Sequence, residues 1–306
     1  IVMMLIAYIQ RPVNFAKAAK AADSKLDRRC SFWYHHTHQV FAPVIIWNIE
    51  IVMTKPIEVT RPPDILPDQV QKSAYVNQMF AAIAGRYDVM NRVMTGGQDQ
   101  RWRRLIVKEC RLPSGGHLLD VATGTGDIGF EAMRLRPDVH VTGVDFTHEM
   151  MLVGQRKADR EGLLDVHGSR LRFADADTLS LPFPDATFDA VCSGFLMRNV
   201  SDIARAFAEQ RRVVKPGGRV VCLEITRPQT PLWRDLFGVY FFRLVPLIGS
   251  LLSGERQAYT YLPHSTLAFP LPQALKGIME GVGLRRVRYK VMMLGTVALH
   301  VGEVSA

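Results

Sequence analysis

A turn that contains two glycines is the first place in this sequence where the backbone could hold a ligand. Residues 117–121 form an apolar run typical of a buried strand, Gly124 and Gly126 follow, and a helical pattern starts at Ile128. A glycine turn at the carboxyl end of a parallel strand lets a ligand approach the backbone closely. Glycines that only shape such a turn are common, so the turn by itself is weak evidence for a nucleotide site.

An acidic residue further along the chain makes this prediction more specific. Residues 139–144 read as a second buried strand, which ends in Asp145, nineteen residues after Gly126. A carboxylate at that position is placed to accept hydrogen bonds from ribose hydroxyls. Asp127, directly after the turn, would repel a pyrophosphate and suits a cationic ligand. The two acids together favour S-adenosylmethionine over NAD as the cofactor.

Alternating strand and helix patterns must position these residues. Such alternation indicates a parallel sheet with right-handed crossovers, and the last two strand patterns indicate an antiparallel pair at the C-terminus. The predicted fold is α/β: a mostly parallel, seven-stranded, Rossmann-like sheet with helices on both faces. The expected strands are residues 117–123, 139–145, 170–175, 188–194, 219–225, 284–293 and 296–301, and the main expected helices are 73–84, 127–136, 148–161, 201–214 and 271–282.

Composition changes along the chain and predicts its domain organisation. Residues 1–52 are atypical and contain His35, His36 and His38, whose grouping is weak evidence for a metal, so no metal site is expected. We expect this part to be a poorly ordered extension outside the functional fold, such as upstream sequence ahead of a start at Met53. A flexible, proline-rich lead-in (53–72) and the functional domain (73–302) follow. An apolar insertion at about 229–265 suits a substrate pocket.

Charge and cysteine content limit the classes of partner. The net charge of +9 suits an anionic membrane surface or nucleic acid without choosing between them. Cys192 and Cys222 fall in predicted buried strands and the four cysteines show no metal-ligand spacing, which favours a reduced, cytoplasmic compartment. A helix with Trp102 and Leu105 beside Arg101, Arg104 and Lys108 could rest on a phospholipid surface, or could equally pack its tryptophan inside.

Three longer motifs stand out: residues 87–102, which begin Tyr-Asp-Val-Met-Asn, residues 194–200, and residues 212–224. Together they resemble a known family, the C-methyltransferases of menaquinone and ubiquinone biosynthesis. The resemblance covers about three quarters of the chain and implies the class I S-adenosylmethionine-dependent methyltransferase fold. The sequence departs from the usual family pattern at Asp99, often His, and at Leu196, usually Gly, which could change how a substrate ring sits.

The resemblance also implies the roles of individual residues. Thr125 and its turn would hold the methionine part of the cofactor and Asp145 the ribose. Asp177 with Thr178 would hold the adenine, with Asp175 as the competing acid. The full set of expected cofactor-binding residues is Asp120, Thr123, Gly124, Thr125, Gly126, Asp145, Asp177, Thr178 and Gly194.

For the substrate ring, the expected residues are Arg198, Tyr87 and Asn199. Arg198 would stabilise a phenolate or polarise a water, because a buried cation lowers the pKa of a phenol. Its alternative is a structural arginine that pairs with an acid. Tyr87 would stack on the ring or merely pack, and His300 is expected to be structural.

The predicted activity is methylation of a ring carbon of demethylmenaquinone by S-adenosylmethionine. The alternatives are methylation of a demethylated ubiquinone precursor, an NAD-dependent dehydrogenase, and a non-catalytic binding module. The expected partners are a lipophilic prenylated quinol, the inner face of a membrane in peripheral contact, and a second copy of the chain in a homodimer. No nucleic acid is expected.

Overall fold

The computed structural model of the protein describes residues 67, 69–163, 170–253 and 256–305. The expectations for residues 1–52, including the three histidines, and for residues 53–66 lie outside this part of the chain. Helix α4 (Gln69–Ile83) begins four residues before the predicted start at Ser73. No proline follows Pro67 until Pro113, so the backbone can become helical directly after the lead-in.

A seven-stranded sheet forms the centre of the described structure, in the order β3-β2-β1-β4-β5-β7-β6. The first five strands are mutually parallel, and β7 runs antiparallel between β5 and β6. This arrangement confirms the predicted fold class. The strands are β1 (His117–Val121), β2 (His140–Asp145), β3 (Leu171–Asp175), β4 (Phe188–Gly194), β5 (Val214–Ile225), β6 (Arg285–Met292) and β7 (Val297–Glu303).

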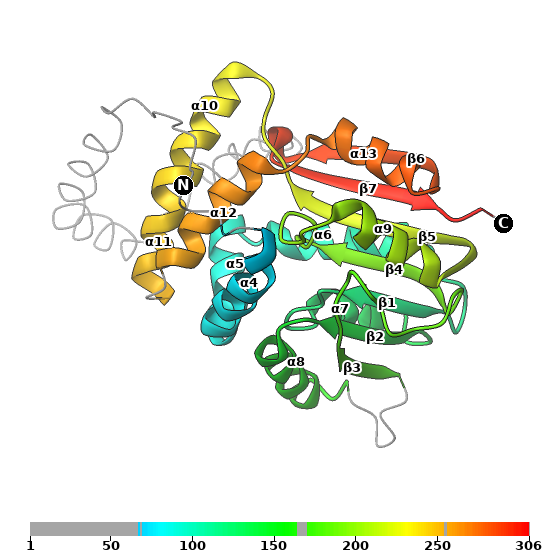
Figure 1. Ribbon diagram of the computed structural model, residues 1–306. Coiled ribbons are helices and arrows are strands. Elements are labelled where there is room, and N and C mark those ends of the chain that lie inside the picture. The colour runs from blue at the N-terminus through cyan, green and yellow to red at the C-terminus, as the bar shows by residue number, and fades with distance from the viewer. Residues whose placement is uncertain (1–66, 68, 164–169, 254–255, 306) are drawn as a thin grey trace, which may run out of the picture.

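Helices cover both faces of the sheet (Figure 1). One face carries α6 (Gln98–Cys110), α7 (Asp127–Leu135) and α8 (His148–Arg160), and the other carries α9 (Ile203–Val213) and α13 (Pro272–Gly281). Two buried clusters result, one around Ile106 and Phe130 and one around Phe207 and Met279. Full burial of each such side chain stabilises the fold by roughly 1.5–3 kcal/mol.

A separate group of helices lies beyond the carboxyl ends of the parallel strands (Figure 1). We call these the cover helices; they are α4, η1 (Ala84–Arg86), α5 (Tyr87–Thr95), α10 (Pro231–Val239), η2 (Tyr240–Leu244), α11 (Val245–Ser253) and α12 (Arg256–Ala268). The predicted apolar insertion supplies the last four. Element η2 is a π-helix that ends two residues before Pro246, whose ring would clash with the carbonyl of the preceding turn in a regular α-helix, so a widened turn precedes it.

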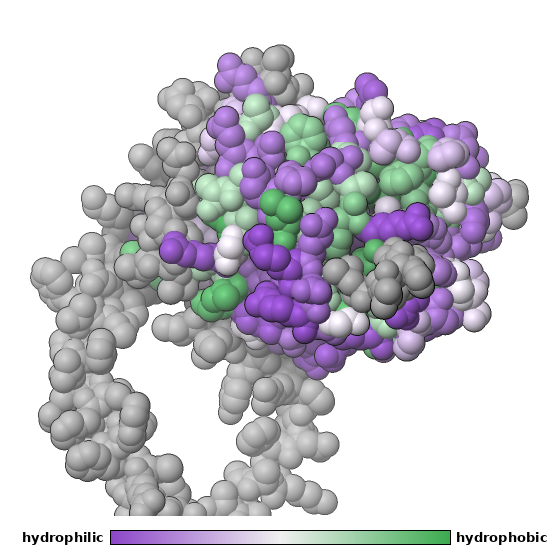
Figure 2. Space-filling view, turned by 90° about the horizontal axis from the view of Figure 1, so that it is seen from below, coloured by the Kyte–Doolittle hydropathy of each residue, from purple (hydrophilic) through white to green (hydrophobic). Residues whose placement is uncertain are grey.

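One face of the molecule is mainly polar where its residues are described. Seen from below, hydrophilic side chains dominate and hydrophobic ones form small groups (Figure 2). Cys110, Cys192 and Cys222 are free and buried, the last two in β4 and β5 as predicted. Within the described ranges, no helix is both long and apolar enough to cross a bilayer.

Candidate active site

Two adjoining cavities lie between the strand ends and the cover helices. The first holds about 1420 Å³ of space, partly open to solvent, and is mainly apolar. The second holds about 830 Å³ and is bordered by the ends of β1, β2 and β4. Both are lined by Tyr87, Gly124, Gly194, Phe195 and Asn199. A ligand on the glycine turn would therefore reach from one cavity into the other.

The glycine turn has the strained backbone that a close approach requires. Gly124 and Gly126 adopt φ values of 57° and 85°, and Ala122 adopts a φ of 56° although it has a side chain. A Cβ at Gly126 would lie 2.6 Å from the buried ring of Phe130. Strained residues of this kind persist only where the surroundings enforce them, and they cluster at ligand sites.

Asp120, in β1, stabilises the glycine turn through hydrogen bonds. Its carboxylate accepts hydrogen bonds from the Thr123 hydroxyl at 2.7 Å and from the Gly129 N–H. Burial raises the pKa of Asp120 to about 6, although these donors oppose the shift. Neither Asp120 nor Gly126 lines a cavity, whereas Thr123 lines the first. Asp120 and Gly126 therefore shape the turn, and their position does not offer a direct ligand contact.

The second cavity gathers the residues expected at the nucleoside. Asp145 lies at its edge and accepts the Gly124 N–H at 2.7 Å and the Thr147 N–H at 2.8 Å. Burial raises the pKa of Asp145 in spite of these bonds. Asp177 also lines this cavity, and so does Thr178, whose buried hydroxyl meets no partner among the described residues. A ribose and a base would satisfy these groups, so the lining fits the nucleoside of S-adenosylmethionine.

Two expectations about this region change. Asp175, the competing acid, points away to His148 at 3.0 Å on the exposed surface and does not line the cavity. Leu196 lines the second cavity and packs in the cluster around Phe207, so it borders the nucleoside side. It does not line the first, apolar cavity, where the substrate ring was expected to meet it.

Asp127 is already neutralised by two cations. Its carboxylate lies 2.5 Å from Lys157 Nζ and 2.8 Å from Arg103 Nη2. The preference for a cationic ligand that its sequence position suggested therefore has no support from its surroundings. The Thr125 hydroxyl is engaged as well, because it donates to Asp88 at 2.6 Å. Only the backbone of Thr125 remains to face the methionine part of a cofactor.

Arg198 is held by a buried ion pair at the wall of the first cavity. Its Nη1 donates to Glu224 Oε2 at 3.0 Å, and Glu224 Oε1 accepts the Met197 N–H at 2.5 Å. Burial raises the pKa of Glu224, while the charge of Arg198 opposes that rise. Phe195 turns the chain here with a φ of 62° and stacks its ring 5.5 Å from the guanidinium. Arg198 Nε is buried and without a partner among the described groups.

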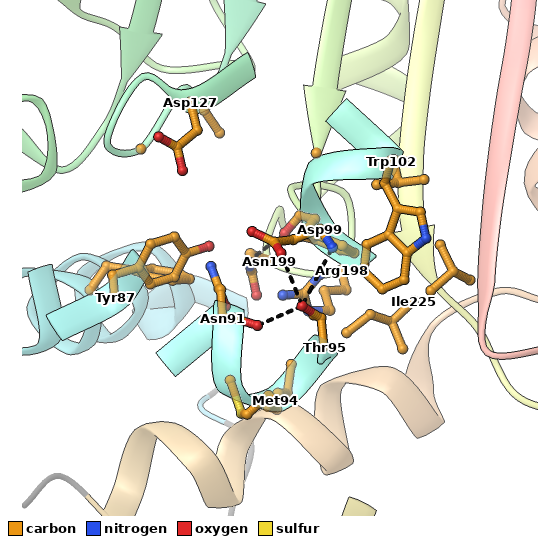
Figure 3. A pocket seen from close by; sticks show the side chains of 18 of the residues that line it. Tyr87, Asn91, Met94, Thr95, Asp99, Trp102, Asp127, Arg198, Asn199 and Ile225 are labelled. Atoms are coloured by element: carbon orange, nitrogen blue, oxygen red, sulfur yellow. Dashed lines mark hydrogen bonds between the residues drawn. The ribbon is translucent and has the colours of Figure 1, made fainter. Parts of the chain in front are cut away.

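Asn199 lies beside Arg198, and Tyr87 lies across the pocket from them (Figure 3). Tyr87 and Asn199 line both cavities and so mark the junction between them. Burial raises the pKa of Tyr87, against a hydrogen bond with Asn91 and the charge of Arg198. Its hydroxyl is thus protonated at neutral pH and can donate a hydrogen bond to a ligand. Asn199 donates to the Phe195 carbonyl at 3.2 Å, and its buried Oδ1 has no partner in the described structure.

Several lining residues escape prediction from the sequence. Tyr261, from α12, lines the first cavity, and burial raises its pKa to about 12. Asp99 and Trp102 line it from α6, with Trp102 95% buried and packed edge-on to Phe195. Trp102 therefore cannot insert into a membrane. The sequence pattern predicted this helix and offered a packed Trp102 as one of two alternatives, but it did not indicate that Asp99 and Trp102 line the cavity.

Other expectations concern residues outside the cavities. Arg104 pairs with Glu131 at 3.0 Å, which makes that part of α6 a solvated charged face. His300 is buried in β7, where Nε2 donates to the Pro272 carbonyl at 2.9 Å, in keeping with a structural role. Among the described residues no cluster of histidine, cysteine or acidic side chains could hold a metal ion.

The sheet order, the glycine turn and the carboxylate at the tip of β2 define an S-adenosylmethionine-dependent methyltransferase. Residues 68–304 match the model of the ubiE/COQ5 methyltransferase family, and the chain belongs to that family. It is 46% identical over 239 residues to a demethylmenaquinone methyltransferase of Roseiflexus castenholzii, covering 78% of this chain and 97% of that protein. It is 42% identical over 233 residues to a ubiquinone/menaquinone biosynthesis C-methyltransferase of Desulfotalea psychrophila, covering 76% and 92%.

Solved structures share the fold at low sequence identity. A phosphoethanolamine N-methyltransferase of Haemonchus contortus, in complex with S-adenosyl-L-methionine, has a TM-score of 0.51 at 15% identity, covering 82% of this chain and 62% of that one. A possible histamine N-methyltransferase of Thermotoga maritima also has a TM-score of 0.51, at 16% identity, covering 74% and 98%. The comparisons confirm the predicted enzyme class and cofactor.

Proposed function

We propose that this enzyme methylates a ring carbon of demethylmenaquinol. Its Roseiflexus relative is named a demethylmenaquinone methyltransferase. The observation that carries the proposal is the apolar cavity, which meets the glycine turn at Tyr87 and Asn199 and has the buried cation Arg198 in its wall. A lipophilic quinol would fit the apolar lining, and the positive charge of Arg198 would stabilise the ionised form of the quinol hydroxyl.

The residues around the junction would position the reactants. Bound S-adenosylmethionine supplies an electrophilic methyl group, which an incoming carbon must approach from the side opposite the sulfur. Asp145, Asp177 and Thr178 would fix the nucleoside in the second cavity. Phe195 and Trp102 would hold the quinol ring from the first cavity. Such alignment supplies much of the acceleration in a displacement reaction.

Arg198 would make the ring carbon a better nucleophile. A guanidinium beside a quinol hydroxyl lowers the pKa of that hydroxyl, so that its proton passes to water in the partly open cavity, and the resulting phenolate pushes electron density into the ring. After the carbon has taken the methyl group, it loses its ring proton to water and the hydroxyl is protonated again. Glu224 fixes one edge of the guanidinium, while Nε stays buried and unpaired within the described structure. Tyr87, protonated at neutral pH, and Asn199 would orient the ring through hydrogen bonds.

The test replaces each of two buried arginines by lysine. Arg198→Lys keeps the charge but loses the fixed planar fork, so we expect kcat for methyl incorporation into demethylmenaquinol to fall about 10²-fold or more. Arg219→Lys is the matched control, because Arg219 is equally buried and pairs with Glu303 at 2.6 Å outside the cavities. Full activity in Arg198→Lys would remove Arg198 from the reaction.

A demethylated ubiquinone precursor is the second candidate substrate, because the Desulfotalea relative is named for both quinones. Both quinols carry a prenyl tail that the apolar lining could take. Parallel assays of the wild-type enzyme with the two substrates at equal tail length would decide, and a higher kcat/KM for the ubiquinone precursor would overturn the preference for menaquinone.

We also propose that the enzyme reaches its substrate through a peripheral membrane contact made by α5 and α11. Val89 and Val93 on α5 and Leu247 on α11 are exposed by 64%, 49% and 49%, and the two helices pack together over the apolar cavity. Arg86 and Arg92 flank the valines and are exposed. This face combines apolar and cationic side chains as an anionic lipid surface requires. The other occupant to be tested is a second copy of the chain in a homodimer.

A further inference from the structure

Asp88, Thr125 and Lys157 meet where the cover helices touch the glycine turn. Thr125 Oγ1 donates to Asp88 Oδ1 at 2.6 Å. Lys157 Nζ lies 2.6 Å from Asp88 Oδ2 and 3.2 Å from Thr125 Oγ1. Asp88 belongs to α5, Thr125 to the turn and Lys157 to α8, so this group joins three separate elements.

The same ammonium group continues the contacts toward α6. Lys157 Nζ is 2.5 Å from Asp127 Oδ1, and Arg103 bridges Asp127 at 2.8 Å and Asp99 at 3.0 Å. We call these six residues the Lys157 network; they are Asp88, Asp99, Arg103, Thr125, Asp127 and Lys157. Asp99, Arg103, Thr125 and Asp127 also line the first cavity. The network therefore runs from the cofactor turn to the wall of the substrate cavity.

Helix α8 packs closely against the glycine turn. A Cβ at Gly154 would lie 3.1 Å from the Thr125 backbone, so a larger residue at this position would crowd the turn. Lys157 follows one turn later on the same face, and its Nζ sits 5.4 Å from the centre of the Phe130 ring. The lysine side chain is only 13% exposed. Because the ammonium group is largely buried, water cannot readily take over its contacts with Asp88 and Asp127 when the lysine is replaced.

We propose that Lys157 is a positioning residue that couples the cofactor turn to the placement of α5 over the substrate cavity. Without its charge, Asp88 and Asp127 would repel each other at close range. Tyr87 directly precedes Asp88 and lines both cavities, so a shift of α5 moves Tyr87 away from the junction. Ordering of the turn by a ligand would reach α5 through Thr125 and Lys157. The assignment of the first cavity to a quinol rests on the proposed function, but the coupling itself does not.

The test measures hydrogen exchange of α5 amides in the full chain, with and without S-adenosylhomocysteine. In the wild type we expect the ligand to slow exchange in α5 as well as in the turn, by about fivefold or more, since site-to-site coupling is typically of that order. In Lys157→Met we expect faster exchange of α5 and no further slowing by the ligand, while the turn itself is still protected. Lys157→Arg should restore part of the effect.

A matched control separates this role from general stabilisation. Lys215, in β5, forms an ion pair with Asp189 at 2.9 Å away from both cavities, with a lysine side chain that is 44% exposed, so Lys215→Met should leave the response of α5 intact. Ligand-induced protection of α5 in Lys157→Met equal to that of the wild type would overturn the proposal. If Lys157→Met fails to fold, Asp88→Asn gives the same comparison, because it removes the charge at the α5 end. Absence of methyl transfer to demethylmenaquinol would refute the proposed substrate and leave this result unaffected.

Discussion

At the scale of single residues, burial of Asp120 disfavours the ionised form of its carboxyl group and raises its pKa. Its pKa of about 6 lies above the value of about 3.9 for an exposed aspartate, so the folded protein binds a proton more tightly than the unfolded chain between those pH values. This group therefore makes the folded state less stable as pH rises from about 4 to 6. The total change is on the order of 3 kcal/mol.

Asp120→Asn should remove this pH dependence. The measurement is urea unfolding of both proteins at pH 4.5, 5.5 and 7, with the difference in unfolding free energy as the readout. As pH rises, we expect the unfolding free energy of the variant to increase relative to that of the wild type, because only the wild type has a buried carboxyl group that must ionise. A difference that stays constant over the three pH values would mean that Asp120 titrates as an ordinary exposed aspartate.

Residue identities in the cofactor turn could be predicted, whereas their partners could not. Asp145 and Gly124 follow from strand ends and local spacing, which short stretches of sequence contain. The neutralisation of Asp127 by Arg103 and Lys157 depends on helices 24 and 30 residues away. Tyr261 and Glu224 become relevant only through tertiary contact with the region of Arg198. Sequence patterns carry no information of that kind.

At the scale of elements, the connection from β1 to α7 depends on Gly126. A side chain at this position meets two separate penalties: a left-handed backbone with φ of 85°, and a collision at 2.6 Å with Phe130. Gly217 supplies a control for the first penalty alone, since it has a φ of 79° and open space around its Cβ position. The pair of glycines therefore separates backbone strain from packing.

Gly217→Ala should destabilise the protein by about 1–2 kcal/mol through the backbone alone. Gly126→Ala should cost more than that and should also weaken S-adenosylhomocysteine binding, because relief of the collision displaces the turn. Urea unfolding and calorimetric titration of both variants provide the two readouts. Equal destabilisation of the two variants, with unchanged ligand affinity, would show that the Phe130 ring simply moves aside.

The elements themselves were largely predictable because their signals are local. The apolar runs of β1, β2, β4 and β5 are typical of strands buried on both faces. The apolar segment after β5 was identified as pocket-forming, but its division into α10, η2 and α11 around Pro246 was not. This apolar segment packs against α5, which lies about 150 residues earlier in the sequence. For example, the Tyr240 hydroxyl donates a hydrogen bond to the Met94 carbonyl, 146 residues away.

At the scale of the whole molecule, charge and apolar surface indicate how the enzyme meets a lipophilic substrate. The net charge of +9 alone does not choose between a membrane and a nucleic acid. The structure adds that Trp102 and Leu105 do not form the lipid-facing surface, because Trp102 is buried in the first cavity. The proposed surface is on α5 and α11, whose inner sides line the apolar cavity through Met94 and Val245.

Vesicle binding tests this surface. Val89→Asp with Val93→Asp should weaken binding of the full chain to vesicles of phosphatidylglycerol and phosphatidylcholine by about tenfold or more, since two exposed valines that enter the lipid each contribute on the order of 1 kcal/mol. The matched control is Val291→Asp on β6, a valine that is 44% exposed on a strand outside the cover helices. Unchanged vesicle binding in the double variant, or an equal loss in the control, would refute the membrane contact.

Light scattering on the same samples tests the homodimer. Conversion of a wild-type dimer to a monomer in the double variant, with vesicle binding intact, would assign this face to a second copy of the chain.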